Sequence, residues 1–182
     1  MTGHEFGVSS EIVGLDTEKI LRTLDAHGVE YVLIGGLASI AHGSTLATAD
    51  ADVVPRPDVG NLARLIEALV SLDARLLMSE RRLGMEGGEP WEVTELRQGP
   101  QSLMASAAWH FTTSAGPIDV VMTATGVGTY EDHLGSVEER EAFGVRILVA
   151  GIDDLIASKE ALQRPKDQAV LGELRELRDG GR

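Results

Sequence analysis

Cysteine is absent from the 182-residue sequence, and aromatic residues are scarce, with two Trp, two Tyr and three Phe. Without cysteine the chain can form no disulfide and has no thiolate nucleophile. The few aromatic side chains exclude an extensive nucleic-acid surface built on base stacking. These absences leave the oxygen and nitrogen side chains as the carriers of any chemistry.

Basic residues are also few, because 16 Lys and Arg against 29 Asp and Glu give a formal net charge of −13. Affinity for a phosphate backbone comes largely from Lys and Arg displacing counterions, so this charge disfavours non-specific binding of nucleic acid. An RNA partner would need a local basic patch. The candidates are Arg81-Arg82 and the pair Arg64 and Arg75, and the alternative is that these arginines are merely solvated.

Long apolar runs are missing as well: none reaches the roughly 18 residues of a membrane-spanning helix. Met1–Ser10 lacks the basic and apolar regions of a signal peptide. We therefore expect a cytoplasmic protein with no membrane partner. We divide it into a flexible lead-in (residues 1–15), a core domain (16–150) and C-terminal helices packed on that core (151–182).

Several motifs of common enzyme classes are absent too. The sequence contains no Walker A, HExxH or GxSxG motif. This argues against a P-loop NTPase, a zinc protease and an α/β hydrolase. We expect His42 to cap a helix or pack, and His110, within a strand pattern, to be structural.

What the sequence does contain is the stretch Tyr31–Pro55, YVLIGGLASIAHGSTLATADADVVP. It opens with a β-branched and aromatic run, Tyr31–Ile34, that suits a buried strand. Gly35-Gly36 follow, and without a Cβ they let the backbone bend sharply and approach a ligand closely. Leu37–His42 is apolar enough for one or two helical turns, whose first N–H groups favour an anion such as phosphate.

Asp50 and Asp52 open the next apolar run. In a strand, residues i and i+2 project from the same face. Two carboxylates held roughly 6 to 7 Å apart in this way repel each other and raise one pKa unless a cation intervenes. Carboxylate oxygens suit Mg²⁺, which commonly binds one or two carboxylates together with substrate phosphates. The pair predicts a metal site.

The chain around this stretch predicts alternating helices and strands. Asp16 or Thr17 can cap a helix that Gly28 ends, and Asp58 can cap a second helix before a strand at Ala74–Met78. The polar segment Ser79–Gln101 has no clear period. We expect it to be a long loop and assign acceptor recognition to it.

Asp119 is the only charged residue in a run that otherwise suits burial, Ile118–Met122. We expect Trp109–Thr113 and Ile118–Thr123 to form a hairpin. A buried unpaired carboxylate is costly, so Asp119 needs a partner. On a strand beside Asp50 and Asp52 it would complete a three-carboxylate site; the alternative is an Asp at a strand edge in solvent.

Lys159 lies on the apolar side of a predicted helix that Asp153 or Asp154 would cap. Asp167 has helical spacing from the apolar residues of the next helix, which we expect to start at Pro165. Lys is almost never fully buried without a partner. An ion pair between Lys159 and Asp167 that joins the two helices is one interpretation, and phosphate binding by the lysine is the other.

These motifs resemble the signature of the nucleotidyltransferase superfamily related to DNA polymerase β: an apolar residue, Gly-Gly or Gly-Ser, a spacer, then Asp-x-Asp. The spacer here, residues 37–49, is near the long end of that pattern. The C-terminal segment is similar to a motif of the minimal bacterial nucleotidyltransferases, including the AbiEii/MenT-type toxins. The residues that carry this similarity are Lys159, Arg164, Lys166 and Asp167.

The resemblance implies an α/β (α+β) nucleotidyltransferase fold, with a mixed β-sheet flanked by helices and a short C-terminal helical pair. It implies metal-dependent transfer of an NMP from an NTP, such as ATP, to a hydroxyl of RNA, protein or a small molecule, with release of pyrophosphate. Mg²⁺ or Mn²⁺ would be the cofactor, and a toxin would have a cognate antitoxin as partner. The implied site comprises the catalytic, metal-binding Asp50, Asp52 and Asp119 and the nucleotide-binding Gly35, Gly36, Lys159 and Asp167.

Two positions depart from the family pattern. Ala51 stands where relatives have a bulky apolar residue, and Leu46 where they often have Arg. Such departures are expected in a relaxed site. The alternative function is therefore a non-catalytic nucleotide- or partner-binding protein of the same fold.

Overall fold

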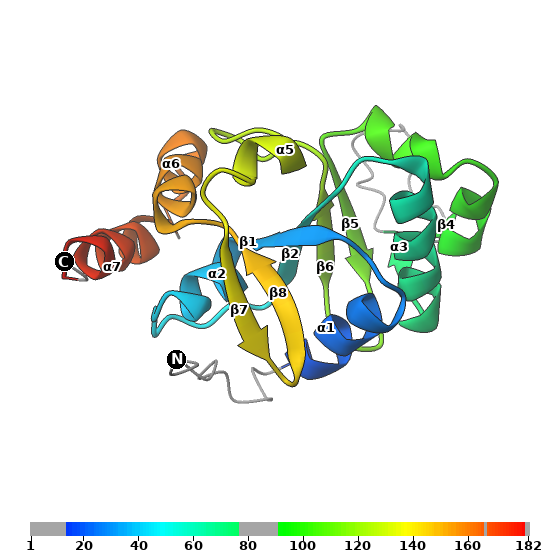
Figure 1. Cartoon of the computed structure of the whole chain (residues 1–182), viewed down its shortest axis with the longest axis horizontal. Coiled ribbons are helices and arrows are strands. Elements are labelled where there is room, and N and C mark those ends of the chain that lie inside the picture. The colour runs from blue at the N-terminus through cyan, green and yellow to red at the C-terminus, as the bar shows by residue number, and fades with distance from the viewer. Residues whose placement is uncertain (1–13, 77–90, 166, 181–182) are drawn as a thin grey trace.

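The computed structural model describes residues 14–76, 91–165 and 167–180 (Figure 1). Residues 1–13 of the predicted lead-in, Arg81-Arg82 and Lys166 lie outside this part. In chain order the elements are α1 (Thr17–Ala26), β1 (Tyr31–Ile34), α2 (Gly35–Ala41), β2 (Ala51–Pro55), α3 (Val59–Ser71), β3 (Arg75–Leu76), β4 (Trp91–Glu92), the 3₁₀ helices η1 (Val93–Gln98) and η2 (Pro100–Ala105), β5 (Ala108–Thr112), β6 (Ile118–Val121), α5 (Tyr130–His133), β7 (Glu138–Ala142), β8 (Val145–Val149), α6 (Ile152–Leu162) and α7 (Asp167–Gly180).

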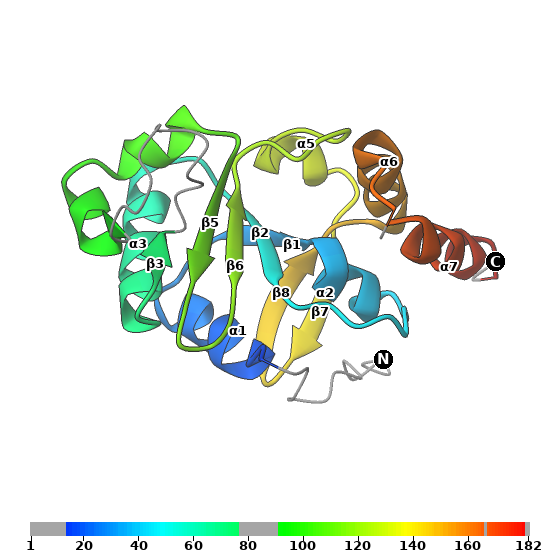
Figure 2. The same ribbon diagram turned by 180° about the vertical axis from the view of Figure 1, so that it is seen from behind.

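The described strands form one mixed sheet in the order β4-β3-β5-β6-β2-β1-β8-β7. At its centre β2 runs antiparallel to β1 and parallel to β6, while β1 runs parallel to β8. The hairpin β5–β6 extends the sheet on one side, as Figure 2 shows, and β7 ends it on the other. The coarse prediction of a mixed α/β fold with a helix-flanked sheet and a C-terminal helical pair is thus confirmed.

Two helices, α1 and α3, pack against each other, and each also contacts the sheet. Both begin where the sequence predicts, because the side chains of Asp16 and Asp58 accept hydrogen bonds from backbone N–H groups of the first turn. Gly28, with φ +63°, ends the first of them. The apolar faces are fully buried at Ile20, Leu21, Leu24, Leu62, Leu65, Ile66 and Leu69.

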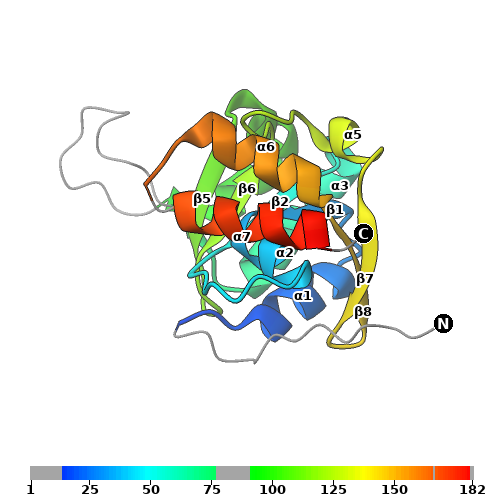
Figure 3. The same cartoon turned by 90° about the vertical axis from the view of Figure 1, so that its left-hand side faces the viewer.

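The C-terminal pair, α6 and α7, packs together, and α6 also contacts α2 (Figure 3). The predicted cap of α6 is wrong, because Gly151 takes the N-cap position and Asp153 and Asp154 lie in the first turn. There their negative charges still interact favourably with the N-terminal N–H groups. The next helix begins at Asp167, two residues after the predicted start at Pro165.

The prediction of a long loop over Ser79–Gln101 is wrong for its described part. Residues 91–105 form β4, η1 and η2, and both 3₁₀ helices contact α3. Val93 and Leu103 are buried in the core, and Arg97 donates two 2.7 Å hydrogen bonds to Glu67 on α3. These contacts hold the segment against α3, and acceptor recognition by it stays a prediction.

Arg64, proposed with Arg75 as a basic patch, is held by partners in the protein. Its side chain donates to the carbonyl of Gly28 at 2.8 Å and pairs with Glu30. None of the described helices is long and apolar enough to span a membrane.

Candidate active site

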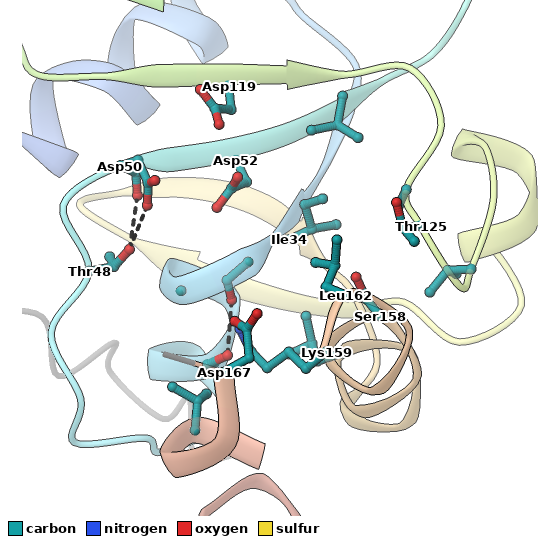
Figure 4. Close-up of a pocket in the computed structure, with 18 of the residues that line it drawn as sticks. Ile34, Thr48, Asp50, Asp52, Asp119, Thr125, Ser158, Lys159, Leu162 and Asp167 are labelled. Atoms are coloured by element: carbon teal, nitrogen blue, oxygen red, sulfur yellow. Dashed lines mark hydrogen bonds and ion pairs between the residues drawn. The ribbon is translucent and has the colours of Figure 1, made fainter. Parts of the chain in front are cut away.

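All seven residues predicted for the site line one cavity of about 540 Å³ (Figure 4). The cavity lies where the segment leading into β2, the start of α2, strand β6 and the C-terminal helices meet. Its predicted members come from segments more than a hundred residues apart in sequence, and they are Gly35, Gly36, Asp50, Asp52, Asp119, Lys159 and Asp167.

The carboxylates come together because two parallel strands are in register. Asp52 on β2 is the direct cross-strand partner of Asp119 on β6, so the predicted placement of Asp119 beside Asp52 is correct. Asp50 lies just before β2. Figure 4 shows the three side chains on the same side of the cavity.

Two of the three carboxylates have side-chain partners of their own. The Thr48 hydroxyl donates a 2.8 Å hydrogen bond to Asp50 Oδ1. His110 is the cross-strand partner of Asp119 on the β5–β6 hairpin, and its Nδ1 lies 2.8 Å from Asp119 Oδ1. His110 also lines the cavity. The predicted hairpin, with Ser114–Pro117 as its turn, places Thr112 opposite Asp119. The observed register pairs Phe111 with Ile118 and brings His110 to Asp119 instead.

Asp52, by contrast, makes no side-chain hydrogen bond or ion pair with the described residues. Burial, followed by the negative charges of Asp50 and Asp119, raises its pKa from 3.8 to about 7, although Lys159 and Arg164 act in the opposite direction. At neutral pH the ionised carboxylate is therefore destabilising. A bound cation would remove this penalty.

This raised pKa predicts how stability depends on pH. A carboxyl whose pKa is higher in the folded state stabilises the fold below pH 4, and this contribution is lost as the pH rises through 7. Asp52→Asn cannot ionise, so without divalent metal we expect it to be more stable than wild type by about 1 to 3 kcal/mol at pH 8. The difference should vanish near pH 4. Urea unfolding at both pH values measures it, and an equal difference at both would contradict the assignment.

The two glycines make room for side chains of the site. A Cβ on Gly35 would overlap the Asp52 carboxylate, and a Cβ on Gly36 would overlap the Thr48 side chain. Gly35 also has a φ of +66°, in the region that favours glycine. The glycine pair predicts close approach of a ligand, but the first neighbours are the side chains of Asp52 and Thr48.

We expect Gly35→Ala to destabilise the protein by about 2 to 4 kcal/mol, because it adds backbone strain to a steric clash with Asp52. Gly172→Ala is the matched control. Its added methyl group on α7 meets nothing within 4 Å, so it should stabilise slightly through helix propensity. Thermal unfolding of both variants measures the contrast. A Gly35→Ala protein as stable as wild type would show that Asp52 can move away without cost.

Lys159 is buried, and its Nζ lies 3.4 Å from Asp167 Oδ1. Arg164 donates to the same carboxylate from Nε at 2.7 Å. Burial acts to raise the pKa of Asp167, but the Arg164 hydrogen bond and the two positive charges outweigh it and hold that pKa below its usual value. The predicted ion pair between Lys159 and Asp167 therefore exists, and it lies on the cavity wall.

The residue types fit a divalent cation, because Asp50, Asp52 and Asp119 supply the hard oxygen ligands that Mg²⁺ and Mn²⁺ prefer. The burial of Asp52 and its repulsion by Asp50 and Asp119, which together raise its pKa, also favour one. As the side chains stand, however, no three His, Asp or Glu residues of the described ranges converge on a point that could hold a metal. One oxygen each of Asp50 and Asp119 is turned to Thr48 and His110, so a metal would have to draw these carboxylates inward.

Comparison of the whole chain with models of protein families, and with curated proteins, finds no match.

Proposed function

We propose that this protein is a metal-dependent nucleotidyltransferase with the corresponding fold, which transfers an NMP from an NTP to an acceptor hydroxyl and releases pyrophosphate. One observation carries the proposal: Asp52 and Asp119, adjacent on parallel strands, share a cavity with the buried Lys159. Clustered carboxylates favour a divalent cation, and a lysine beside them favours phosphate. A metal–triphosphate complex satisfies both requirements.

In this proposal the ammonium group of Lys159 binds the triphosphate, and Gly35 and Gly36 make room for Asp52 and Thr48 beside it. Asp50, Asp52 and Asp119 would hold Mg²⁺, which when bound stabilises negative charge on the attacking and leaving oxygens. An acceptor hydroxyl in the cavity transfers its proton to Asp119. That carboxylate has one oxygen against His110 Nδ1, which keeps the other directed away from the imidazole. Holding both substrates in one cavity provides much of the remaining acceleration.

A non-catalytic nucleotide-binding protein is the second candidate. The observation that favours it is the paired state of Lys159, together with carboxylates turned toward Thr48 and His110. A cavity of this kind can hold a nucleotide without reacting. This second candidate predicts that the protein binds NTP but transfers no NMP to any acceptor.

Label transfer separates these candidates. Each α-³²P-labelled NTP is incubated with the protein, Mg²⁺ and cell extract, and RNA, protein and small molecules are then separated. We expect Mg²⁺-dependent label in one fraction, which also identifies the acceptor class. Folded protein that binds NTP but labels no fraction, with extracts from several sources, would favour the second candidate.

A toxin role and a cognate antitoxin are proposals that depend on the motif resemblance alone. Growth arrest on expression, relieved by Asp52→Asn, would support them. Unchanged growth with active enzyme would contradict them.

A further inference from the structure

The loop that joins α2 to β2 carries Asp50 into the site with little support from the hydrophobic core. Of residues 44–50 only Ser44 is buried, and four of the seven are exposed. Segments with few buried contacts open locally at low cost in free energy. The position of this loop, and of Asp50 at its end, therefore depends on its polar contacts.

Glu173 on α7 accepts three hydrogen bonds from the start of this loop. Its Oε1 accepts 2.8 Å bonds from the backbone N–H and from the hydroxyl of Thr45, and its Oε2 accepts one from the Ser44 hydroxyl. These bonds, the one from Ser44 first, hold the pKa of Glu173 below its usual value. Hydrogen bonds to an ionised carboxylate are stronger than those between neutral groups. Glu173 does not itself line the cavity, so it would act on the site through the loop.

Thr48 connects this anchored start of the loop with Asp50. Only Leu46 and Ala47 lie between Thr45 and Thr48 in the sequence. The Thr48 side chain packs so closely on Gly36 that a Cβ there would overlap it, and its hydroxyl donates to Asp50 Oδ1 (Figure 4). A continuous series of contacts thus runs from α7 through the loop to the Asp50 carboxylate.

The helix that carries Glu173 is itself held in place. Leu171 and Leu174 of α7 are buried in the core, and Asp167, at its first position, pairs with Lys159. One helix therefore contacts both the lysine proposed to bind phosphate and the loop that carries a carboxylate proposed to bind metal.

We propose that Glu173 is a positioning residue, which through the loop of residues 44–50 fixes Asp50 relative to Lys159 and so determines the affinity of the site for a divalent cation. This inference depends on the proposed function, because it takes Asp50 as a metal ligand. Without the three hydrogen bonds of Glu173, the loop would spend part of its time in conformations in which Asp50 is out of place.

Titration of the full chain with Mn²⁺, in which electron paramagnetic resonance counts the free ion, tests the inference. If Glu173→Ala leaves the anchored loop populated at about one tenth, the apparent Kd for Mn²⁺ rises about 10-fold, which is the expected result. Glu173→Gln should stay within about 3-fold of wild type, because its amide oxygen accepts both bonds from Thr45 and its amide N–H reaches Ser44. Glu176→Ala, at an exposed position on the same helix, is the matched control and should bind like wild type.

A double variant shows whether Glu173 acts through Asp50. Asp50→Asn should itself weaken Mn²⁺ binding, and Glu173→Ala added to it should weaken binding no further, because the two residues belong to one network of contacts. A loss of stability alone would not give this pattern, since the affinity is measured on folded protein. The inference is overturned if Glu173→Ala has the same effect in both backgrounds, or if it binds within about twofold of wild type.

Asp52→Asn separates failure of this inference from failure of the proposed function. If Asp52→Asn weakens Mn²⁺ binding and Glu173→Ala does not, the proposed metal site stands and the role of Glu173 is overturned. If wild type binds no Mn²⁺, or binds it no better than Asp52→Asn does, both are overturned.

Discussion

If the protein is the proposed nucleotidyltransferase, Asp52→Asn is expected to lower transfer by about 10³-fold or more, because loss of a carboxylate proposed to bind the metal would remove several kcal/mol of transition-state stabilisation. Asp52 lies among the charges of Asp50, Asp119 and Lys159, and it is the one carboxylate of the three without a side-chain partner in the described chain. Of the three proposed ligands, it would therefore give up the least on binding a cation. Initial rates of label transfer at saturating NTP and Mg²⁺ measure the effect.

The same variant should be at least as stable as wild type, which separates loss of chemistry from loss of fold. Asp25→Asn, at an exposed position on α1, is the matched control and should keep full activity. Transfer by Asp52→Asn within tenfold of wild type would remove Asp52 from the proposed metal site.

Asp167→Ala is expected to destabilise the protein by about 3 to 5 kcal/mol, because it leaves the buried ammonium of Lys159 without its partner. Asp167 is 3% exposed and Lys159 8%. Arg164 loses the same carboxylate, but its side chain is half exposed and can be solvated. Urea unfolding at pH 7 measures the loss.

A double variant distinguishes the structural role of this pair from its role in the site. In Lys159→Met/Asp167→Leu the two charges are replaced by apolar groups of similar size, so most of the stability should return. Transfer should not return, because the ammonium proposed to bind phosphate is gone. Full activity in the double variant would show that Lys159 only joins the two helices. If Asp167→Ala lowers the free energy of unfolding by less than about 1 kcal/mol, water must reach the Lys159 ammonium and solvate it.

The sequence predicted those parts of the fold in which local pattern and tertiary environment agree. The apolar run at Tyr31–Ile34 became the strand β1, and the run that contains Asp119 became the strand β6, both next to β2 in the sheet. The isolated charge of Asp119 within an apolar run was the strongest signal for the site. A carboxylate within an apolar run needs a partner, and His110, opposite it on β5, is that partner.

Other elements could not be predicted from the sequence, because they form through tertiary contacts. The strand β7 has the sequence Glu-Glu-Arg-Glu-Ala, which lacks β-branched residues, and it exists by pairing with β8 at the sheet edge. The 3₁₀ helices after residue 92 depend on packing against α3. Neither leaves a periodic pattern in the sequence.

The histidines show the same limit at the site. His110 pairs with Asp119 across a hairpin, and His133 pairs with Asp154, 21 residues later in the chain. Nothing in the local sequence distinguishes them from structural histidines. The role of Gly35-Gly36 was predicted only in part. The sequence indicates that some group comes close to this backbone, but it does not indicate that this group is the Asp52 side chain.

The central claim is that Asp50, Asp52, Asp119 and Lys159 form one site for a metal–triphosphate complex. The most direct test is a crystal structure with Mn²⁺ and a non-hydrolysable α,β-methylene NTP, in which anomalous scattering locates the metal. We predict a Mn²⁺ peak within coordination distance of at least two of the three carboxylates, with the triphosphate against Lys159. Nucleotide bound elsewhere, or bound in this cavity with no metal between it and the carboxylates, would contradict the claim.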